Sequence, residues 1–144
     1  MMTSISYNLR VGIVITYFNG NFRLYDSITY QQMWYHEEMD LKEEENRDFN
    51  ITFVCSKLST THGLLAIGGL EGRIFLFDAS SKTKVGMNDE IHDTEILSIF
   101  FNDKKSQMIT SSIDRKIALW DSTMFECLSV VKDTSSNLNW KAVS

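Results

Sequence analysis

The sequence predicts an all-β protein assembled from repeated units of short antiparallel strands, and two observations support this prediction. Three segments align without a gap, namely VITYFNGNFRLYD (14–26), AIGGLEGRIFLFD (66–78) and ITSSIDRKIALWD (109–121). Each segment ends in an aromatic residue followed by Asp, and these ends lie 52 and 43 residues apart. A period of about 40–45 residues with several short strands per unit is typical of the blades of a β-propeller.

Within each unit the pattern predicts four strands. Turns at Asn19-Gly20 and Glu71-Gly72 place Gly where a tight hairpin needs a positive φ. In the third strand of the second unit, Ile74 and Leu76 are expected on one face and Phe75 and Phe77 on the other. The innermost strands are expected to be buried on both faces, because ILSIFF (96–101) is an almost continuous apolar run.

The predicted units divide the whole chain. Blade one covers about 3–36, an acidic inter-blade loop covers 37–48, blade two covers about 50–88, and blade three covers about 92–132. Residues 137–144, around Trp140, are a candidate start of a further blade. Three blades are too few for a closed ring, and each open end would expose an apolar sheet face. We therefore expect an incomplete propeller: a fragment of a longer chain, a truncated product, or a piece that another chain completes.

The third unit resembles the repeat of the WD40 family. It begins at His92-Asp93, continues through EILSIFF, NDKKS and QMITSSIDRKIAL, and closes on Trp120-Asp121. Repeats of that family contain a hydrogen-bonded set that joins a loop His, a Ser or Thr on the second strand, a turn Asp and the Trp. The resemblance implies that this structural set consists of His92, Thr110, Asp114 and Trp120.

The first two units resemble the family repeat less closely. Asn19 and Glu71 replace the turn Asp, and no His stands at the matching place before the second unit. Residues 5–8 lie at the same distance from Thr16 as residues 99–102 lie from Thr110, which extends the match to the first strand. The pairs that close the repeats are Tyr25-Asp26, Phe77-Asp78 and Trp120-Asp121.

Composition narrows the class of protein. With 144 residues, 43% of them hydrophobic, and a net charge of −5, the chain fits one soluble domain. Its apolar runs are too short to cross a bilayer, and no secretory signal is visible at the N-terminus. Cys55 and Cys127 are too few for a disulfide framework, so we expect strand residues with reduced thiols in an intracellular, most simply cytoplasmic, protein.

The strongest charge feature is EEMDLKEEENRD (37–48), which has seven acids and two bases. It is a candidate contact for a basic protein partner, and the alternative is a solvated, mobile insertion. An acidic surface of this kind disfavours a nucleic-acid backbone as the ligand. The candidate partner-binding residues are Glu37, Glu38, Asp40, Glu43, Glu44, Glu45 and Asp48.

The sequence predicts no cofactor, no metal site and no enzymatic activity. His36, His62 and His92 are scattered, and none is part of a pair at metal-ligand spacing. His92 near Asp93 and Asp114 could be a base with its orienting acid, but the family resemblance favours a structural hydrogen-bond set. The cluster of Gly68-Gly69 and Gly72 lies between strands and lacks a following Lys-Ser/Thr, so it indicates a hairpin and not a phosphate loop.

The resemblance implies a non-catalytic scaffold module that mediates protein–protein interactions as a subunit of a larger assembly. Its partners are expected to be other subunits, or chains that complete the propeller, with no nucleic acid and no membrane insertion. The alternatives are a substrate-recruiting or peptide-reading adaptor of the ubiquitin-ligase or chromatin type and, more remotely, a propeller hydrolase or lactonase. Degenerate repeats without proline suggest a cytoskeletal or ciliary assembly.

Overall fold

The computed structural model describes residues 1–38 and 51–133, and their strands form three four-stranded antiparallel sheets. Each sheet follows chain order from its innermost to its outermost strand. Blade 1 contains β1 (Met2–Asn8), β2 (Gly12–Tyr17), β3 (Asn21–Tyr25) and β4 (Gln32–Glu37). Blade 2 contains β5 (Phe53–Leu58), β6 (Leu64–Gly69), β7 (Ile74–Asp78) and β8 (Thr83–Asn88). Blade 3 contains β9 (Ile96–Asn102), β10 (Gln107–Ser112), β11 (Lys116–Asp121) and β12 (Glu126–Lys132).

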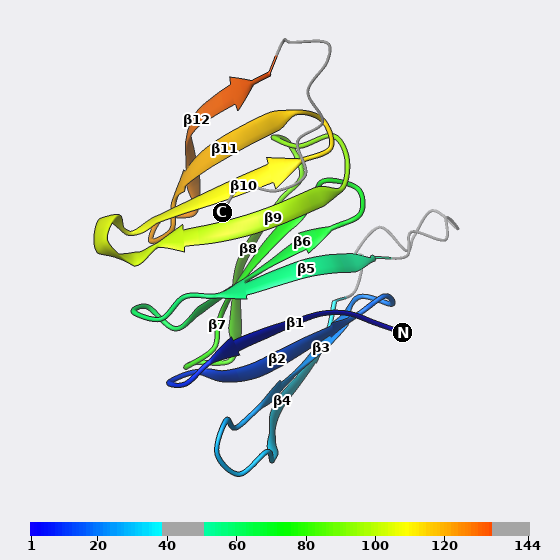
Figure 1. Cartoon of the computed structure of the whole chain (residues 1–144), viewed down its shortest axis with the longest axis vertical. Helices are drawn as coiled ribbons and strands as arrows, with labels where there is room; N and C mark the ends of the chain where they lie inside the picture. Colours follow the sequence, from blue (N-terminus) through cyan, green and yellow to red (C-terminus); the bar gives the residue numbers. More distant parts are fainter. Residues whose placement is uncertain (39–50, 134–144) are drawn as a thin grey trace.

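The three sheets are stacked face to face along the long axis of the molecule, with blade 2 in the middle (Figure 1). The innermost strands β1, β5 and β9 lie side by side, so the blades fan out from one edge. The predicted all-β class, with three blade-like sheets in a partial propeller, is therefore confirmed. In the described part of the chain no helix is long and apolar enough to span a membrane. The predicted start of a further blade at 137–144 lies outside the described residues.

The hairpins between the second and third strands have the predicted turn geometry. Gly20 and Gly72 have φ angles of 79° and 86°, in the left-handed region that glycine adopts without strain. In blade 3 the equivalent residue is Arg115, with φ 66°. These three hairpins lie at one end of the sheets, on the right in Figure 1.

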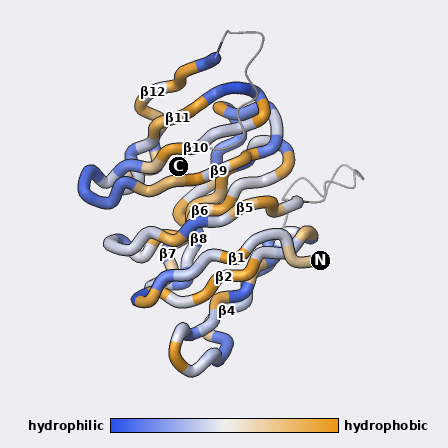
Figure 2. The backbone as a smooth tube through the Cα atoms, viewed as in Figure 1, coloured by the Kyte–Doolittle hydropathy of each residue, from blue (hydrophilic) through white to orange (hydrophobic). Residues whose placement is uncertain are grey.

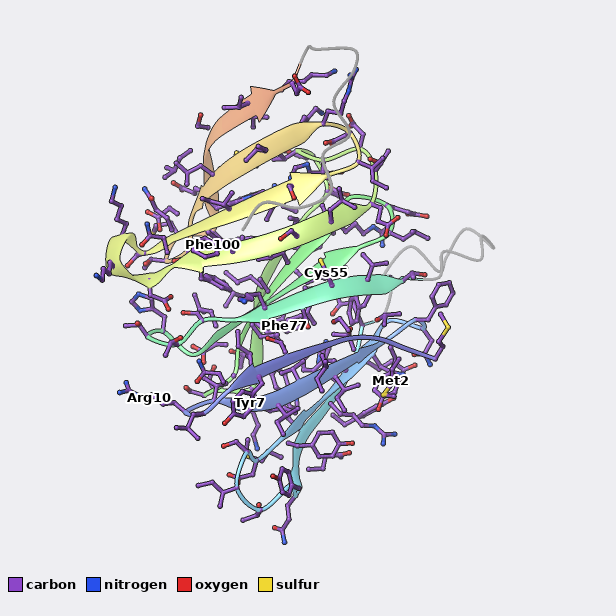
Figure 3. All side chains as sticks on the ribbon, in the orientation of Figure 1. Met2, Tyr7, Arg10, Cys55, Phe77 and Phe100 are labelled. Atoms are coloured by element: carbon purple, nitrogen blue, oxygen red, sulfur yellow. The ribbon has the colours of Figure 1, made fainter. Side chains whose placement is uncertain are left out.

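Two apolar clusters hold the blades together, one on each face of blade 2. The predicted alternation along β7 is confirmed, because Phe75 and Phe77 belong to the cluster shared with blade 1, and Ile74 and Leu76 to the cluster shared with blade 3. All four side chains are at most 1% exposed. Phe77 lies in the layer between the first two blades (Figure 3). Within residues 1–38 and 51–133, the middle blade is thus covered on both faces, while a neighbouring blade covers only one face of each outer blade.

The expectation that the innermost strands are buried on both faces is wrong. Ile5 on β1 is 70% exposed and Phe100 on β9 is 39% exposed, whereas every residue of β6 is buried. The physical reason is the position of the blade. Ile5 and Phe100 lie on the faces of blades 1 and 3 that point away from blade 2, whereas β6 belongs to the middle blade, which has an apolar cluster on each face.

The proposed equivalence of Thr16 and Thr110 is also wrong. Thr16 pairs with Ser4, and the residue in the corresponding register of blade 3 is Ser111, which pairs with Ser98. The turn between the first two strands is one residue longer in blade 3, since Asn8 pairs with Gly12 but Asn102 pairs with Gln107. Because successive strand residues face opposite sides, this one-residue shift places Thr16 and Thr110 on opposite faces of their blades.

The longer turn joins blade 3 to blade 2. It contains a 3₁₀ turn at Asp103–Lys105 and is strongly hydrophilic (Figure 2). Ser59 Oγ and the Thr60 amide of blade 2 donate hydrogen bonds of 2.6 and 3.1 Å to the Asp103 carboxylate. The Asp103 side chain therefore links blade 3 to blade 2, while its backbone forms part of the 3₁₀ turn.

Candidate functional site

The structure brings His92, Thr110, Asp114 and Trp120 together between blades 2 and 3. His92 lies in the loop from β8 to β9, Thr110 on β10, Asp114 in the β10–β11 hairpin, and Trp120 on β11. The Trp120 Nε1–H donates to Thr110 Oγ1 at 2.9 Å, and His92 Nε2 lies 2.8 Å from the same oxygen. His92 Nδ1 lies 3.3 Å from Asp114 Oδ2. These four residues form one continuous hydrogen-bonded chain.

The donors and acceptors of this chain match when His92 is neutral. Thr110 Oγ1 accepts from Trp120, so its own hydrogen is free to point at His92 Nε2, and the Nδ1–H then donates to Asp114. Burial lowers the pKa of His92, and this outweighs the opposing attraction of Asp114. The imidazole is therefore uncharged near neutral pH. Its side chain is 0% exposed, so no substrate can reach it as a base.

Asp114 collects donors from both sides of the loop. The backbone N–H groups of Asp93 and Lys116 donate to its two oxygens at 2.9 and 2.8 Å. Burial would raise the pKa of Asp114, but these two amides and His92 together lower it below its ordinary value. Lys116 Nζ also bonds the exposed Asp93 carboxylate at 2.8 Å. We interpret this hydrogen-bonded set as a structural link between the β8–β9 loop and the β10–β11 hairpin.

The closing aromatic residues of the other two repeats differ in burial. Phe77, at the place of Trp120, is fully buried, with its ring centroid 5.0 Å from Phe22 and 4.9 Å from His36. Tyr25 is only half-buried, because no blade of the described residues packs against its face. Trp120 stacks on Phe125 with centroids 5.5 Å apart.

The Asp of each closing pair caps the following turn, a role that the sequence interpretation did not assign. Asp26 Oδ1 accepts the amides of Ile28 and Thr29, both at 2.8 Å. Asp78 and Asp121 accept the equivalent pair of amides, at 2.9 and 3.1 Å and at 2.8 and 3.1 Å. These backbone donors, with Thr29 first, lower the pKa of Asp26. The recurrence of Asp at this position was the signal, since Asp side chains bond amides two or three residues ahead in such turns.

Of the candidate partner-binding acids, the structure describes only Glu37 and Glu38. The Glu38 carboxylate bonds His36 Nε2 at 2.9 Å and pairs with Lys84 of blade 2, and its side chain is 6% exposed. Glu38 therefore joins two blades and is not free to meet a partner. Asp40, Glu43, Glu44, Glu45 and Asp48 lie outside the described residues.

A row of exposed apolar residues was missed in the sequence. Phe18, Leu70 and Ile113 occupy the same position in the three β2–β3-type hairpins, and they are 47%, 43% and 54% exposed. We call this end of the molecule the hairpin face and define it by Phe18, Leu70 and Ile113 with the adjacent Asn19 and Glu71. The gapless alignment already contained the signal, because a turn position next to polar residues is apolar in all three repeats.

Other chemically notable groups are isolated. Burial raises the pKa of the Cys55 thiol to about 12, so it is not nucleophilic at neutral pH. A shallow pocket of about 260 Å³ lies at the opposite end of the sheets, between the turns that carry Arg10 and Lys82. Within residues 1–38 and 51–133, no group of three or more His, Cys, Asp or Glu residues is placed to hold a metal ion.

Comparison with known proteins finds similarity to proteins that contain WD repeats. No protein-family model matches the chain. The chain is 28% identical over 102 residues to the WD repeat-containing protein 89 homolog of Dictyostelium discoideum, which covers 67% of this chain. It is 30% identical over 69 residues, 46% of this chain, to WD repeat-containing protein 1 of Xenopus tropicalis. The chain spans 28% and 11% of the lengths of these two relatives. The similarity to two WD repeat proteins and the three four-stranded blades together confirm the predicted resemblance to the WD40 repeat.

Proposed function

We propose that this chain is a non-catalytic scaffold module that binds a protein partner on its hairpin face. The observation that supports the proposal is the row of Phe18, Leu70 and Ile113, one exposed apolar side chain per blade at the same turn position. Apolar groups that are kept exposed side by side are a common mark of interaction sites on protein surfaces.

The turns that carry these side chains are rigid. The Gly20, Gly72 and Arg115 amides close them with hydrogen bonds of 3.2, 3.4 and 3.1 Å to the carbonyls of Tyr17, Gly69 and Ser112. Antiparallel strands anchor both ends of each turn. A partner therefore meets side chains that are already in place, and little conformational entropy is lost on binding.

The exposed acids of the hairpin face have cations beside them: Glu71 lies 3.9 Å from Arg73 and Asp93 lies 2.8 Å from Lys116. The excess of acids is in the segment 37–48, which has seven acids and two bases. The segment begins at this end of the sheets, because the Glu38 amide bonds the Gly20 carbonyl at 2.9 Å. An excess of acids favours a partner with basic residues and steers its approach. Both cysteines are free thiols, which fits the proposed intracellular setting.

Site-specific photo-crosslinking tests this proposal. A photoreactive phenylalanine analogue replaces Leu70 in one variant and Ile28 in a matched control, since Ile28 is 78% exposed but lies in the β3–β4 turn at the other end. The expected result is a discrete protein adduct from position 70 that is absent from position 28. The adduct is then identified and its dissociation constant measured.

Removing the apolar side chain should weaken that complex. Leu70→Ser is expected to raise the dissociation constant about tenfold or more, because burying a Leu side chain contributes about 1.5–3 kcal/mol. The strand signal in circular dichroism should not change, because the residue is in an exposed turn. Equal crosslinking from position 28, or an unchanged dissociation constant for Leu70→Ser, would overturn the proposal.

A further inference from the structure

The shallow pocket between blades 1 and 2, at the end of the sheets opposite the hairpin face, has a volume of about 260 Å³. Two turns flank it, residues 9–11 between β1 and β2 and residues 79–82 between β7 and β8. Arg10 of the first turn lies at the left end of the sheets in Figure 3, away from the hairpins. The residues that line the pocket include two cations, Arg10 and Lys82, and no acid.

The apolar part of the lining is continuous with the core between the two blades. Leu24 and Ala79 are buried members of that core, exposed by 2% and 9%, and Val11 packs against it. Met33 also lines the pocket and is 37% exposed. An apolar group placed in the pocket would contact these core residues and remove part of Met33 from water, which is favourable.

The size of the pocket limits what it can hold. Pockets that enclose whole small molecules have volumes of about 300–1,000 Å³, and this one is smaller. It is therefore suited to one or two side chains of a larger ligand, whose remaining groups stay outside, next to the charged turns.

The repeat indicates that an apolar ring fits between blades at this end. Lys82 stands where blade 3 has Phe125, four residues after the closing Asp and with a similar left-handed φ, 56° against 54°. The Phe125 ring stacks on Trp120 at 5.5 Å and packs against the cluster between blades 2 and 3. In the junction of blades 1 and 2, Trp34 packs on Phe77 at 6.0 Å, and the pocket remains beside Met33. Because Lys82 brings no ring into this junction, a partner can supply one.

The two cations select the charge of the ligand. Arg10 and Lys82 are exposed, and within residues 1–38 and 51–133 neither side chain forms an ion pair or a hydrogen bond. They come from the two blades that flank the pocket, so carboxylates on both sides of an inserted side chain can pair with them. Exposed ion pairs each contribute little to affinity, so the apolar side chain supplies most of the binding energy and the charges supply selectivity.

We propose that this pocket binds an acidic peptide segment of a partner protein, with one aromatic or other large apolar side chain in the pocket and carboxylates paired with Arg10 and Lys82. A nucleic-acid backbone fits less well, because it needs a larger basic patch than two cations in a chain of net charge −5. The site is at the other end of the sheets from the hairpin face and is independent of what binds there.

Binding of a defined acidic peptide, followed by NMR on the isotope-labelled full chain, tests this proposal. The peptide is acetyl-EDEFEDE-amide, and about 0.15 M salt suppresses unspecific attraction between charges. Saturable shifts of backbone amides are expected at residues 9–11 and 79–82, with a dissociation constant below about 1 mM. A second peptide with Ser in place of the Phe should bind about tenfold more weakly or worse, because it has no apolar side chain to bury.

Charge reversal identifies the two cations. Lys82→Glu and Arg10→Glu should each raise the dissociation constant of the Phe peptide about three- to tenfold, with an unchanged circular-dichroism strand signal. The matched control is Lys105→Glu, an exposed cation of the β9–β10 turn that does not line the pocket, and it should change the constant less than about twofold. Leu70→Ser on the hairpin face should leave the constant unchanged.

Five outcomes would each overturn the proposal. They are the absence of saturable shifts below about 1 mM, shifts confined to another surface, equal affinity of the Phe and Ser peptides, equal effects of Lys82→Glu and Lys105→Glu, and the same shifts with a short DNA duplex. Because the readout is the peptide constant and the shifted amides, none of these outcomes bears on the partner of the hairpin face.

Discussion

Replacing Asp114 with Ala should destabilise the fold through the buried set in blade 3. The carboxylate accepts hydrogen bonds from the Asp93 and Lys116 amides at 2.9 and 2.8 Å, and from His92 Nδ1 at 3.3 Å. The His92 side chain is 0% exposed, so water cannot replace the lost acceptor at its ring. A buried donor without a partner costs about 1–3 kcal/mol, whereas the two amides lie near the surface and can bond water. We therefore expect the free energy of unfolding to fall by about 1–3 kcal/mol.

Urea denaturation followed by circular dichroism measures this change. Asp93→Ala is the matched control, because that carboxylate is 70% exposed and its bond to Lys116 is a surface ion pair worth about 0–1 kcal/mol. Asp114→Ala should lower the urea midpoint clearly more than Asp93→Ala, with the same slope. Equal effects of the two variants, or loss of partner binding by Asp114→Ala at an unchanged midpoint, would refute the structural interpretation of the set.

Two further predictions concern the same junction. The pKa of His92 is lowered in the folded state, so below its ordinary value of 6.5 the unfolded chain binds a proton that the folded chain does not. Stability should then be complete above about pH 6.5 and fall as the pH falls, and in urea melts between about pH 7 and 5 His92→Gln should lose less stability than the wild type. Gly72→Ala should cost more than about 2 kcal/mol, because the φ angle is +86° and a Cβ would lie 2.4 Å from the His92 carbonyl oxygen. Gly63→Ala, with φ +63° but only the Ser80 hydroxyl nearby at 3.1 Å, should cost about 1 kcal/mol, and a smaller loss for Gly72 than for Gly63 would contradict this reasoning.

Much of the fold could be predicted because it depends on local patterns. A strand alternates its side chains between two faces, so the order Ile74, Phe75, Leu76, Phe77 already indicated two separate cores, and the structure has them. The Gly residues of the hairpins indicated positive φ because few other residues adopt it without strain. Family resemblance supplied the four members of the set at His92, Thr110, Asp114 and Trp120, which the structure places within hydrogen-bonding distance.

The rest depended on contacts between segments distant in the chain. A turn one residue longer placed Ser111, and not Thr110, in the register of Thr16, and no pattern along the strand reveals which face a neighbour will cover. Glu38 belongs to the acidic run in the sequence, yet Lys84 and His36 hold it between two blades. The sequence alone determined the repeat, the strands and the residues able to form the hydrogen-bonded set of blade 3. Only the tertiary structure decided which of two equivalent residues, such as Phe22 and Ile117, is buried, because burial is set by the neighbouring blade and not by the residue itself.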